Sequence, residues 1–457
     1  MASEPVSIDV KAWLEEARFG AYQKFLLALC FLTLLLDGFD AQVIAVAAPG
    51  LTAHLGLEPA ELGALFAGGT LGGAVAGFLI APFSNRLGRR VLIAGSLGLS
   101  GVLTLGYLVA ATLPQLLALR IGCGFLLAVA VSVTFSYAAE ITPRRMAVRG
   151  VMFTTTGFGI GVAMSGFIGA WMIPAFGWQS VFITGGVLTI IASVLLVFLL
   201  PESARYMAYR GGQNARLREV LKRIDPGREM PDGAIFVLNE EQKPGLALTH
   251  ILGSGRAGPV MMLWAVGFLV NVNIWILVQW LPTFVREAGA DISQASVAVG
   301  WFKMGGIVGG LICAYFVDRA RNGYPLLTVV AVACAASFLL LAEIDAKTTA
   351  FLFAVVLTGM LIHAVSYTNG GLLARMLPTY VRMPGMAISG GFSRLGSMTG
   401  PLGVGLLKQV GWSNAMIFKA ALIPLLLCAV LFVLLAVFTV RLREREESSG
   451  EGAPAVA

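Results

Sequence analysis

The sequence predicts an all-α polytopic membrane protein, and three observations carry that prediction. Of its 457 residues, 57% are apolar and only 12% are charged, where a soluble domain has roughly 25% charged residues. The mean hydropathy is +0.83. The net charge is +7, and the basic residues lie in short clusters between apolar runs. That pattern is typical of membrane orientation rather than of a nucleic-acid surface, so no nucleic-acid partner is expected.

Twelve apolar segments are each long enough to cross a bilayer of about 30 Å. The abundance of glycine and the absence of ten-residue alternation favour helices over a barrel. The expected spans are 24–49, 59–81, 91–111, 114–138, 149–172, 178–200, 258–285, 293–317, 325–343, 349–374, 384–408 and 414–440.

The basic residues of the short loops predict the orientation. With the N-terminus in the cytoplasm, the outer loops hold only Arg286, Lys347 and Lys408. The inner loops and tail hold thirteen arginines, which are Arg86, Arg89, Arg90, Arg144, Arg145, Arg149, Arg319, Arg321, Arg375, Arg382, Arg441, Arg443 and Arg445. Since positive loops stay inside, both termini are predicted to be cytoplasmic in the cell's inner membrane.

The two halves of the chain repeat each other. The segment GGAVAGFLIAPFSNR at 72–86 aligns without gaps to GGIVGGLICAYFVDR at 305–319, an offset of 233. A six-plus-six duplication is typical of secondary transporters, which bind substrate near mid-membrane between the repeats. The predicted organisation is an N-terminal six-helix bundle at 1–200, a polar cytoplasmic linker at 201–257, a C-terminal bundle at 258–440 and a tail at 441–457.

The chain carries no pattern for cofactor or metal chemistry. GxxxxGK[ST] and HExxH are both absent, and the five cysteines are scattered inside apolar runs without ligand spacing. We therefore expect no cofactor, no metal and no enzymatic activity, since no nucleophile–base constellation is recognisable.

Several motifs resemble those of a known superfamily. NRLGRR at 85–90, its degenerate copy DRARNG at 318–323 and PESARYM at 201–207 are similar to signature elements of the major facilitator superfamily. DGFD at 37–40 and GFSRLGSMTGP at 391–401 resemble spans 1 and 11 of its aromatic acid:proton symporters. The resemblance implies the major facilitator fold, with 12 transmembrane helices in two pseudo-symmetric six-helix bundles, and import of benzoate-like carboxylates with protons.

The same resemblance implies a gate around the signature loop. This chain departs from the family pattern at Asn85, where the superfamily usually has an acid, and at Lys303, which has no counterpart. Glu140 at the inner end of span 4 is expected to form an ion pair beside Arg144, Arg145 and Arg149. The predicted gating residues are Asn85, Arg86, Arg89, Arg90, Glu140, Asp318 and Arg319.

Charges inside the spans are candidates for function, because a mid-membrane charge costs at least ~2.5–3.5 kcal/mol. Asp37 and Asp40 share one face of span 1. Two carboxylates this close do not readily ionise together, so the pair is predicted to couple protons, although a salt bridge with Arg120 is an alternative role for either. Arg394 in span 11 is a bidentate partner for a substrate carboxylate or for an aspartate of span 1.

Three further residues complete the predicted substrate site. Arg120 in span 4 is a substrate contact or a structural partner, and Lys303 in span 8 is a second anion contact or a lysine of a hydrated cavity. Asn273 in span 7 occupies the repeat position of the span 1 aspartates. His363 is interpreted as a hydrogen-bonded buried histidine.

Three transport functions and one other class remain open. The leading one is proton-coupled import of an aromatic carboxylate by a monomer in the lipid bilayer. Uptake of a non-aromatic acid, such as a dicarboxylate, would suit Lys303. Drug export is disfavoured because GFGIGVAMSGFIG at 157–169 lacks proline. A transport-dead sensor would have little reason to keep buried charges.

Overall fold

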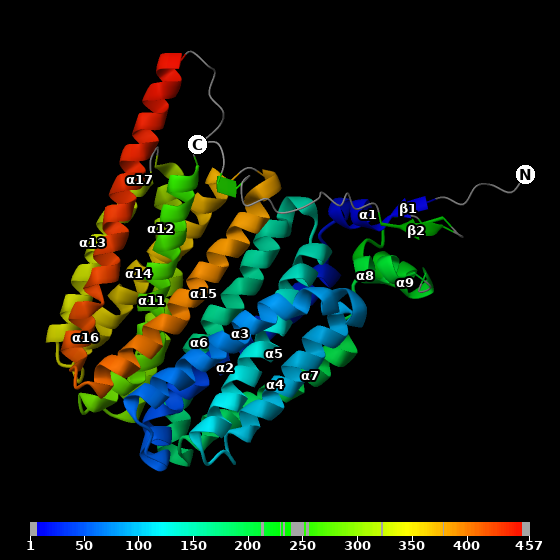
Figure 1. Ribbon diagram of the computed structural model, residues 1–457. Coiled ribbons are helices and arrows are strands. Elements are labelled where there is room, and N and C mark those ends of the chain that lie inside the picture. The colour runs from blue at the N-terminus through cyan, green and yellow to red at the C-terminus, as the bar shows by residue number, and fades with distance from the viewer. Residues whose placement is uncertain are drawn as a thin grey trace, which may run out of the picture. The chain divides into compact units, whose positions relative to one another are not determined.

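The computed structural model describes residues 7–211, 214–228, 230–231, 234–238, 251–252, 256–320, 323–377 and 379–449; the side chains of 78, 80–86, 147–148, 318, 379–384 and 440–449 lie outside this description. Long helices occupy all twelve predicted spans (Figure 1). They are α2 (Ala21–Leu55), α3 (Pro59–Leu87), α4 (Arg89–Gly106), α5 (Leu113–Ile141), α6 (Ala147–Phe176), α7 (Gln179–Leu199), α11 (Ala257–Glu287), α12 (Ile292–Arg319), α13 (Tyr324–Glu343), α14 (Thr349–Met376), α15 (Thr379–Gln409), and α16 (Asn414–Ala420) followed by α17 (Leu422–Ser449).

Local sequence explains where several helices begin. Thr112 and Gln115 form a capping box at the start of α5, and Asp291 and Gln294 form another at the start of α12. Such boxes satisfy the free N–H groups of a first turn. Within the described residues, nine helical segments are long and apolar enough on their own to cross a membrane. Helices α3, α4 and α15 fall outside that set, although each lies at a predicted span.

By internal contacts the chain divides into two compact units. Unit 1 comprises Met1–Ala41, Leu71–Val162 and Phe182–Lys243, and unit 2 comprises Gln42–Thr70, Ala163–Val181 and Pro244–Ala457. Parts of α2, α3 and α6 therefore belong to each unit. The six-plus-six boundaries derived from the repeat describe duplication rather than packing, and they stay a prediction.

Unit 1 is held together by apolar side chains and by close helix contacts. Its core includes Leu29, Leu97, Val133 and Leu196, from four different helices. Gly161 allows α6 to touch α2, because a Cβ there would collide with the carbonyl oxygen of Leu35. Small residues permit such approach of backbones in membrane helices.

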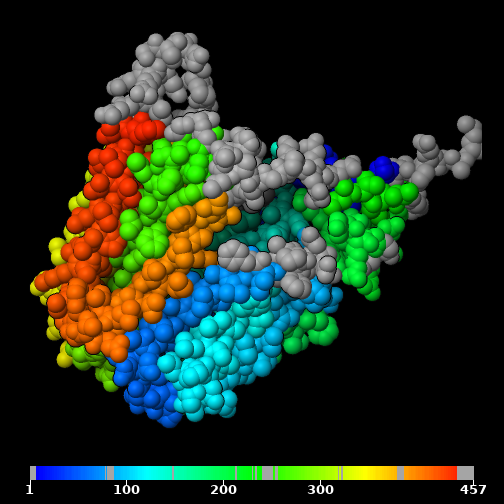
Figure 2. All heavy atoms as spheres, viewed as in Figure 1, coloured from blue at the N-terminus to red at the C-terminus, as the bar shows by residue number. Residues whose placement is uncertain are grey.

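The N-terminus and the central loop form a small module in unit 1. It contains β1 (Ser7–Asp9), α1 (Val10–Glu16), α8 (Ala204–Arg210), α9 (Asn214–Ile224) and β2 (Ile235–Val237). The strands pair in parallel, with Ser7 opposite Ile235. Figure 2 shows the green spheres of the loop part of this module gathered as one body.

The described part of the expected linker at 201–257 contributes two helices and a strand to this module. Leu217, Leu221 and Ile224 recur at helical spacing on α9 and are buried with Trp13 and Leu14 of α1. A short amphipathic helix becomes stable when its apolar face is covered. The N-terminal segment provides that cover, which the local composition of the loop did not reveal.

Unit 2 contains α12 packed on α14, α11 on α15 and α13 on α17. The first turns of α3 also pack here. A Cβ at Gly63 would lie 3.0 Å from the carbonyl oxygen of Pro401, and the indole nitrogen of Trp280 donates to that same oxygen at 3.0 Å. The first turns of α3 thus pack against α15 within unit 2, where α11 also contacts α15.

Candidate functional site

A buried ion pair joins α2 and α5 in unit 1. Arg120 Nη1 lies 3.7 Å from Asp40 Oδ2, and the two residues are 4% and 7% exposed. The guanidinium also donates to the carbonyl oxygens of Asp40 and Ala41, at 3.5 and 3.2 Å. The structure therefore brings two predicted site residues together, in the pairing that was the alternative to substrate contact for Arg120.

Helix α4 supplies a third member of this site. The Thr104 hydroxyl donates to Asp40 Oδ1 at 2.6 Å and lies 3.8 Å from Cys123 Sγ. The carboxylate is therefore contacted by a cation and a hydroxyl from two neighbouring helices. Thr104 was missed by sequence reasoning, since an isolated threonine in an apolar span gives no signal. Asp37, one turn before Asp40, is half-buried.

A second charged cluster connects two sequence motifs in unit 1. Arg89 Nη2 lies 3.3 Å from Glu140 Oε1, and the Ser203 hydroxyl donates to the other oxygen of Glu140. Glu202 Oε1 accepts from the backbone N–H groups of Arg89 and Arg90, at 2.8 and 3.3 Å. A carboxylate at a helix N-terminus is stabilised by the free N–H groups and the helix dipole.

The cluster contains the ion pair that was expected of Glu140. Its partner is Arg89, because α4 begins beside the inner end of α5. Gly88 has φ of 86° at the start of α4, and a Cβ there would collide with Glu202. The loop at 85–90 and the PESAR motif at 201–205 are therefore in direct contact.

The structure describes the side chains of only some of the other predicted gating residues. The side chains of Asn85, Arg86 and Asp318 lie outside the described residues. Arg319 is exposed, with its guanidinium 3.6 Å from the ring centre of Tyr315.

Unit 2 holds a buried basic pair between α12 and α14. Lys303 Nζ lies 3.0 Å from His363 Nε2, and His363 Nδ1 lies 3.0 Å from the carbonyl oxygen of Gly359. The histidine accepts from the ammonium group and donates to the carbonyl, which satisfies both ring nitrogens. Lys303 and His363 are 7% and 2% exposed. This confirms that His363 is a hydrogen-bonded buried histidine, and its partner is the lysine that had no family counterpart.

Arg394 occupies an open face of α15. Its side chain is exposed, and a Cβ added at Gly390 or Gly391, one turn earlier, would meet no described atom within 4 Å. Phe392 stacks on Trp264 with ring centres 5.6 Å apart. Gly390 and Gly391 leave room for a ligand on the face of Arg394, whereas Phe392, two residues earlier, points to another side of the helix and toward α11.

Polar groups line the contact of α11, α14 and α15. A Cβ at Gly267 would lie 3.2 Å from Ser393 Oγ and 3.6 Å from Asn369 Nδ2. Asn369 donates to the carbonyl oxygen of Leu263 at 3.1 Å. Asn273 is fully buried and donates to Leu269 of its own helix at 3.2 Å. Sequence reasoning named Asn273 and missed Asn369, although the polar TNGG at 368–371 was an available signal.

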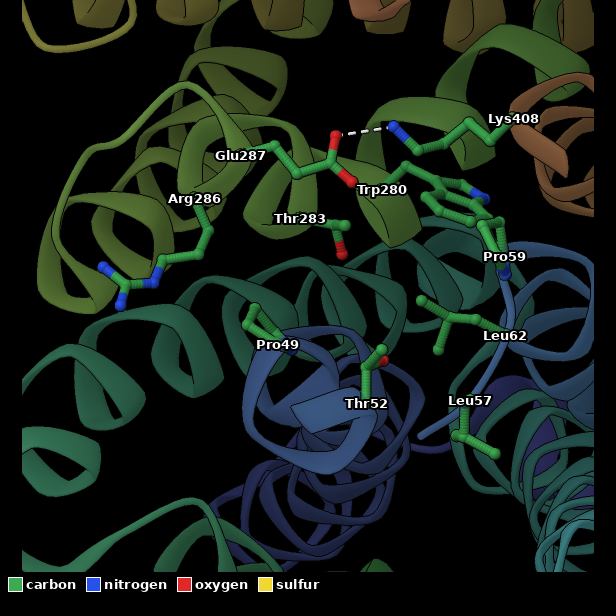
Figure 3. Close-up of a pocket in the computed structure, with 10 residues that line it drawn as sticks. All are labelled: Pro49, Thr52, Leu57, Pro59, Leu62, Trp280, Thr283, Arg286, Glu287 and Lys408. Atoms are coloured by element: carbon green, nitrogen blue, oxygen red, sulfur yellow. Dashed lines mark hydrogen bonds and ion pairs between the residues drawn. The ribbon is translucent and has the colours of Figure 1, made fainter. Parts of the chain in front are cut away.

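The predicted outer ends of α2, α3, α11 and α15 surround a cavity of about 220 Å³ in unit 2. Figure 3 shows Pro49 and Thr52 across from Thr283, with the ion pair of Glu287 and Lys408 above. Lys408 Nζ lies 2.5 Å from Glu287 Oε2. Gln409 donates to Glu58 at 3.0 Å.

A further contact joins α2 to α11 about two helical turns before Pro49. The Gln42 side-chain amide donates to the carbonyl oxygen of Val278 at 2.6 Å. Gln42 is fully buried. It joins the N-terminal half to α11 two residues after Asp40, and sequence reasoning missed it.

Comparison with known proteins agrees with this architecture. The family model described as Major Facilitator Superfamily matches residues 30–370. The 4-hydroxybenzoate transporter PcaK of Pseudomonas aeruginosa is 29% identical, covering 91% of this chain and 93% of that protein. The gallate transporter of Pseudomonas putida is 30% identical, covering 93% and 94%. The benzoate transport protein of Acinetobacter baylyi is 25% identical, covering 92% and 91%.

Solved structures share the fold. A D-xylose-proton symporter superposes with a TM-score of 0.70 at 17% identity, covering 92% of this chain and 97% of that one. A bacterial homologue of the lysosomal transporter Spinster gives 0.67 at 16% identity, covering 95% and 100%.

The family match and the relatives, together with the long apolar helices, identify a membrane-embedded transporter rather than an enzyme. The chain belongs to the Major Facilitator Superfamily.

Proposed function

We propose that this protein imports an aromatic monocarboxylate together with protons, by alternating access. Relatives covering more than nine-tenths of the chain are transporters of 4-hydroxybenzoate, gallate and benzoate. The structural observation that carries the proposal is the buried contact of Asp40 with Arg120. A buried ionisable pair in a membrane helix is costly and is a candidate for ion coupling.

Asp40 is the proposed proton carrier. When Asp40 is ionised, Arg120 and Thr104 stabilise its carboxylate. Protonation removes the negative charge and so weakens the ion pair, which frees the guanidinium to turn toward another anion. Uptake of a proton by Asp40 would thereby loosen the contact between α2 and α5. Asp37 is proposed to exchange protons with the aqueous side, since it is only half-buried.

Arg394 is the proposed partner of the substrate carboxylate. A guanidinium forms two parallel hydrogen bonds with a carboxylate, and the open space beside Gly390 and Gly391 leaves room for an aromatic ring. Arg120 is a second anion contact once Asp40 is protonated.

Lys303 and Asn273 are buried against other residues, so we propose that they position neighbouring helices rather than contact the substrate. Uptake of a dicarboxylate, which would need Lys303 as an anion contact, gains no support.

The cluster of Arg89, Glu140 and Glu202 is proposed to be part of the cytoplasmic gate, together with Asn85, Arg86, Arg90, Asp318 and Arg319. We propose that the protein works as a monomer in the inner membrane. We propose that both termini lie in the cytoplasm, because the arginine-rich short loops then lie inside.

The test is uptake of labelled acids into proteoliposomes, with and without an inward proton gradient. We expect accumulation of 4-hydroxybenzoate or benzoate, but not of succinate, only when the gradient is present. Asp40→Asn should abolish accumulation and keep substrate exchange, while Asp345→Asn, an exposed loop carboxylate, should change neither. Gradient-driven accumulation by Asp40→Asn would refute the role of this carboxylate.

A further inference from the structure

A cavity of about 400 Å³ opens at the first turns of α2 and α6, entirely within unit 1. Its apolar walls include Phe19, Leu27, Met146 and Phe153, and the charged residues among its described lining are Lys24 and Arg149. Both charged residues are exposed. The cavity therefore combines an apolar interior with two cations that can reach solvent.

The surroundings of this cavity are strongly basic. Arg144 and Arg145 form the short 3-10 helix η1 (Arg144–Met146) that leads to it, and both are exposed. Arg18, just before Phe19 in the chain, is exposed as well. No acidic side chain is among the described residues that line the cavity.

Carboxylates of the neighbouring elements contact other arginines. Glu15 lies 3.8 Å from Arg205, and Glu16 lies 3.2 Å from Arg228. Glu140, at the end of α5, is paired with Arg89. The positive charge around the cavity is therefore not neutralised by these acids, and a ligand with a negative group is favoured.

The apolar interior requires a ligand with a hydrophobic body as well as the anion. Phe153 at the wall is 48% exposed, and its neighbour Met152 is 60% exposed. In a membrane protein such side chains are covered by lipid tails or by an apolar ligand. Basic pockets between transmembrane helices on the cytoplasmic side are typical binding sites for acidic lipid head groups.

We propose that this cavity binds an anionic phospholipid of the cytoplasmic leaflet. Lys24 and Arg149 hold the phosphate, and the start of an acyl chain lies against Leu27, Met146 and Phe153. The proposal rests on the orientation assigned above, which places the first turns of α2 and α6 at the inner leaflet. It does not depend on the transported substrate.

The test measures lipid binding by the full-length purified protein, using native mass spectrometry in detergent. Phosphatidylglycerol and phosphatidylethanolamine of identical acyl chains are titrated separately. We expect the first phosphatidylglycerol to bind more tightly than phosphatidylethanolamine. Lys24→Gln and Arg149→Gln should each weaken it about fivefold, and the double variant more, since one basic residue near an anionic lipid contributes about that factor.

Two further variants distinguish lipid binding in this cavity from a general attraction of the lipid to positive charge on the protein. Lys222→Gln removes an exposed cation of α9 in the same unit and should leave phosphatidylglycerol binding unchanged. Met146→Trp fills the cavity but keeps both cations, and it should weaken phosphatidylglycerol binding. Should a charge variant fail to fold, as shown by its thermal unfolding, Met146→Trp still decides.

Four results would overturn the proposal. They are equal binding of the two lipids, equal losses in Lys222→Gln and Arg149→Gln, unchanged phosphatidylglycerol binding in Met146→Trp, and displacement of phosphatidylglycerol by soluble 4-hydroxybenzoate. The last would identify the cavity as a site for an aromatic acid instead. Because no transport is measured, failure here leaves the proposed function intact, and failure of uptake leaves the lipid site intact.

Discussion

Arg120 lies 3.7 Å from Asp40, although 80 residues separate them and both are buried in unit 1. Each charge offsets the cost of burying the other, because an isolated ion in an apolar interior is strongly destabilised. Removing either partner alone would therefore leave an uncompensated buried charge. The pair is also proposed to respond to protonation.

The mutual dependence of these two residues predicts a non-additive pair of mutations. Arg120→Gln leaves the Asp40 carboxylate buried without its cation and should destabilise the protein by about 3–5 kcal/mol. Adding Asp40→Asn should recover much of that loss, since two neutral amides replace two charges. Thermal unfolding of the purified variants in detergent measures both effects. Simply additive losses would contradict the coupling.

Substrate binding should depend on Arg394. Arg394→Ala removes the proposed bidentate partner of the carboxylate and should weaken binding of 4-hydroxybenzoate by about 2–5 kcal/mol. Calorimetric titration of the purified protein measures this. Lys419→Ala, which removes a surface cation paired with Glu343 at 2.8 Å, is the control and should bind normally. Near-native affinity in Arg394→Ala would exclude this contact.

Lys303 should act through His363 rather than through substrate charge. Lys303→Met removes the donor to His363 Nε2, so transport of monocarboxylates and dicarboxylates should fall by the same factor. Uptake of benzoate and of an aromatic dicarboxylate is compared in proteoliposomes. A selective loss for the dicarboxylate would instead identify Lys303 as a second anion contact.

Gln42 should favour the closed arrangement of the end of unit 2 that contains the cavity of Figure 3. Gln42→Leu removes the hydrogen bond to Val278, which contributes about 1 kcal/mol, a factor of about five in a two-state equilibrium. Labelling of Thr283→Cys by an impermeant maleimide should therefore become faster by about that factor. The same labelling in Gln409→Leu, which removes the exposed contact to Glu58, should change less. Equal rates with and without Gln42 would count against a closing role.

The orientation can be tested at positions that the structure shows to be exposed. Lys222→Cys on α9 should resist an impermeant maleimide in intact cells and react after permeabilisation, because the module lies on the predicted cytoplasmic side. Lys347→Cys, in the loop before α14, should react in intact cells. Both side chains are exposed, so accessibility reports the side of the membrane. Labelling of Lys222→Cys in intact cells would reverse the topology.

The sequence alone determined the membrane class, the twelve helices, the superfamily and the candidate charges. These properties are local, since long apolar runs must become helices where no water can satisfy the backbone. Spacing along one helix placed Asp37 and Asp40 on a shared face, but it could not show which neighbouring helix they meet.

Only the tertiary structure decided the partners. The packing of α2 against α4 and α5 brings Thr104 and Arg120 to Asp40, and that of α12 on α14 brings Lys303 to His363. The same reason explains the ordered loop, where α9 gains its stability from the distant N-terminal segment. Each of these contacts depends on how one helix is rotated and placed against another, and that is determined by packing across long sequence separations rather than by local pattern.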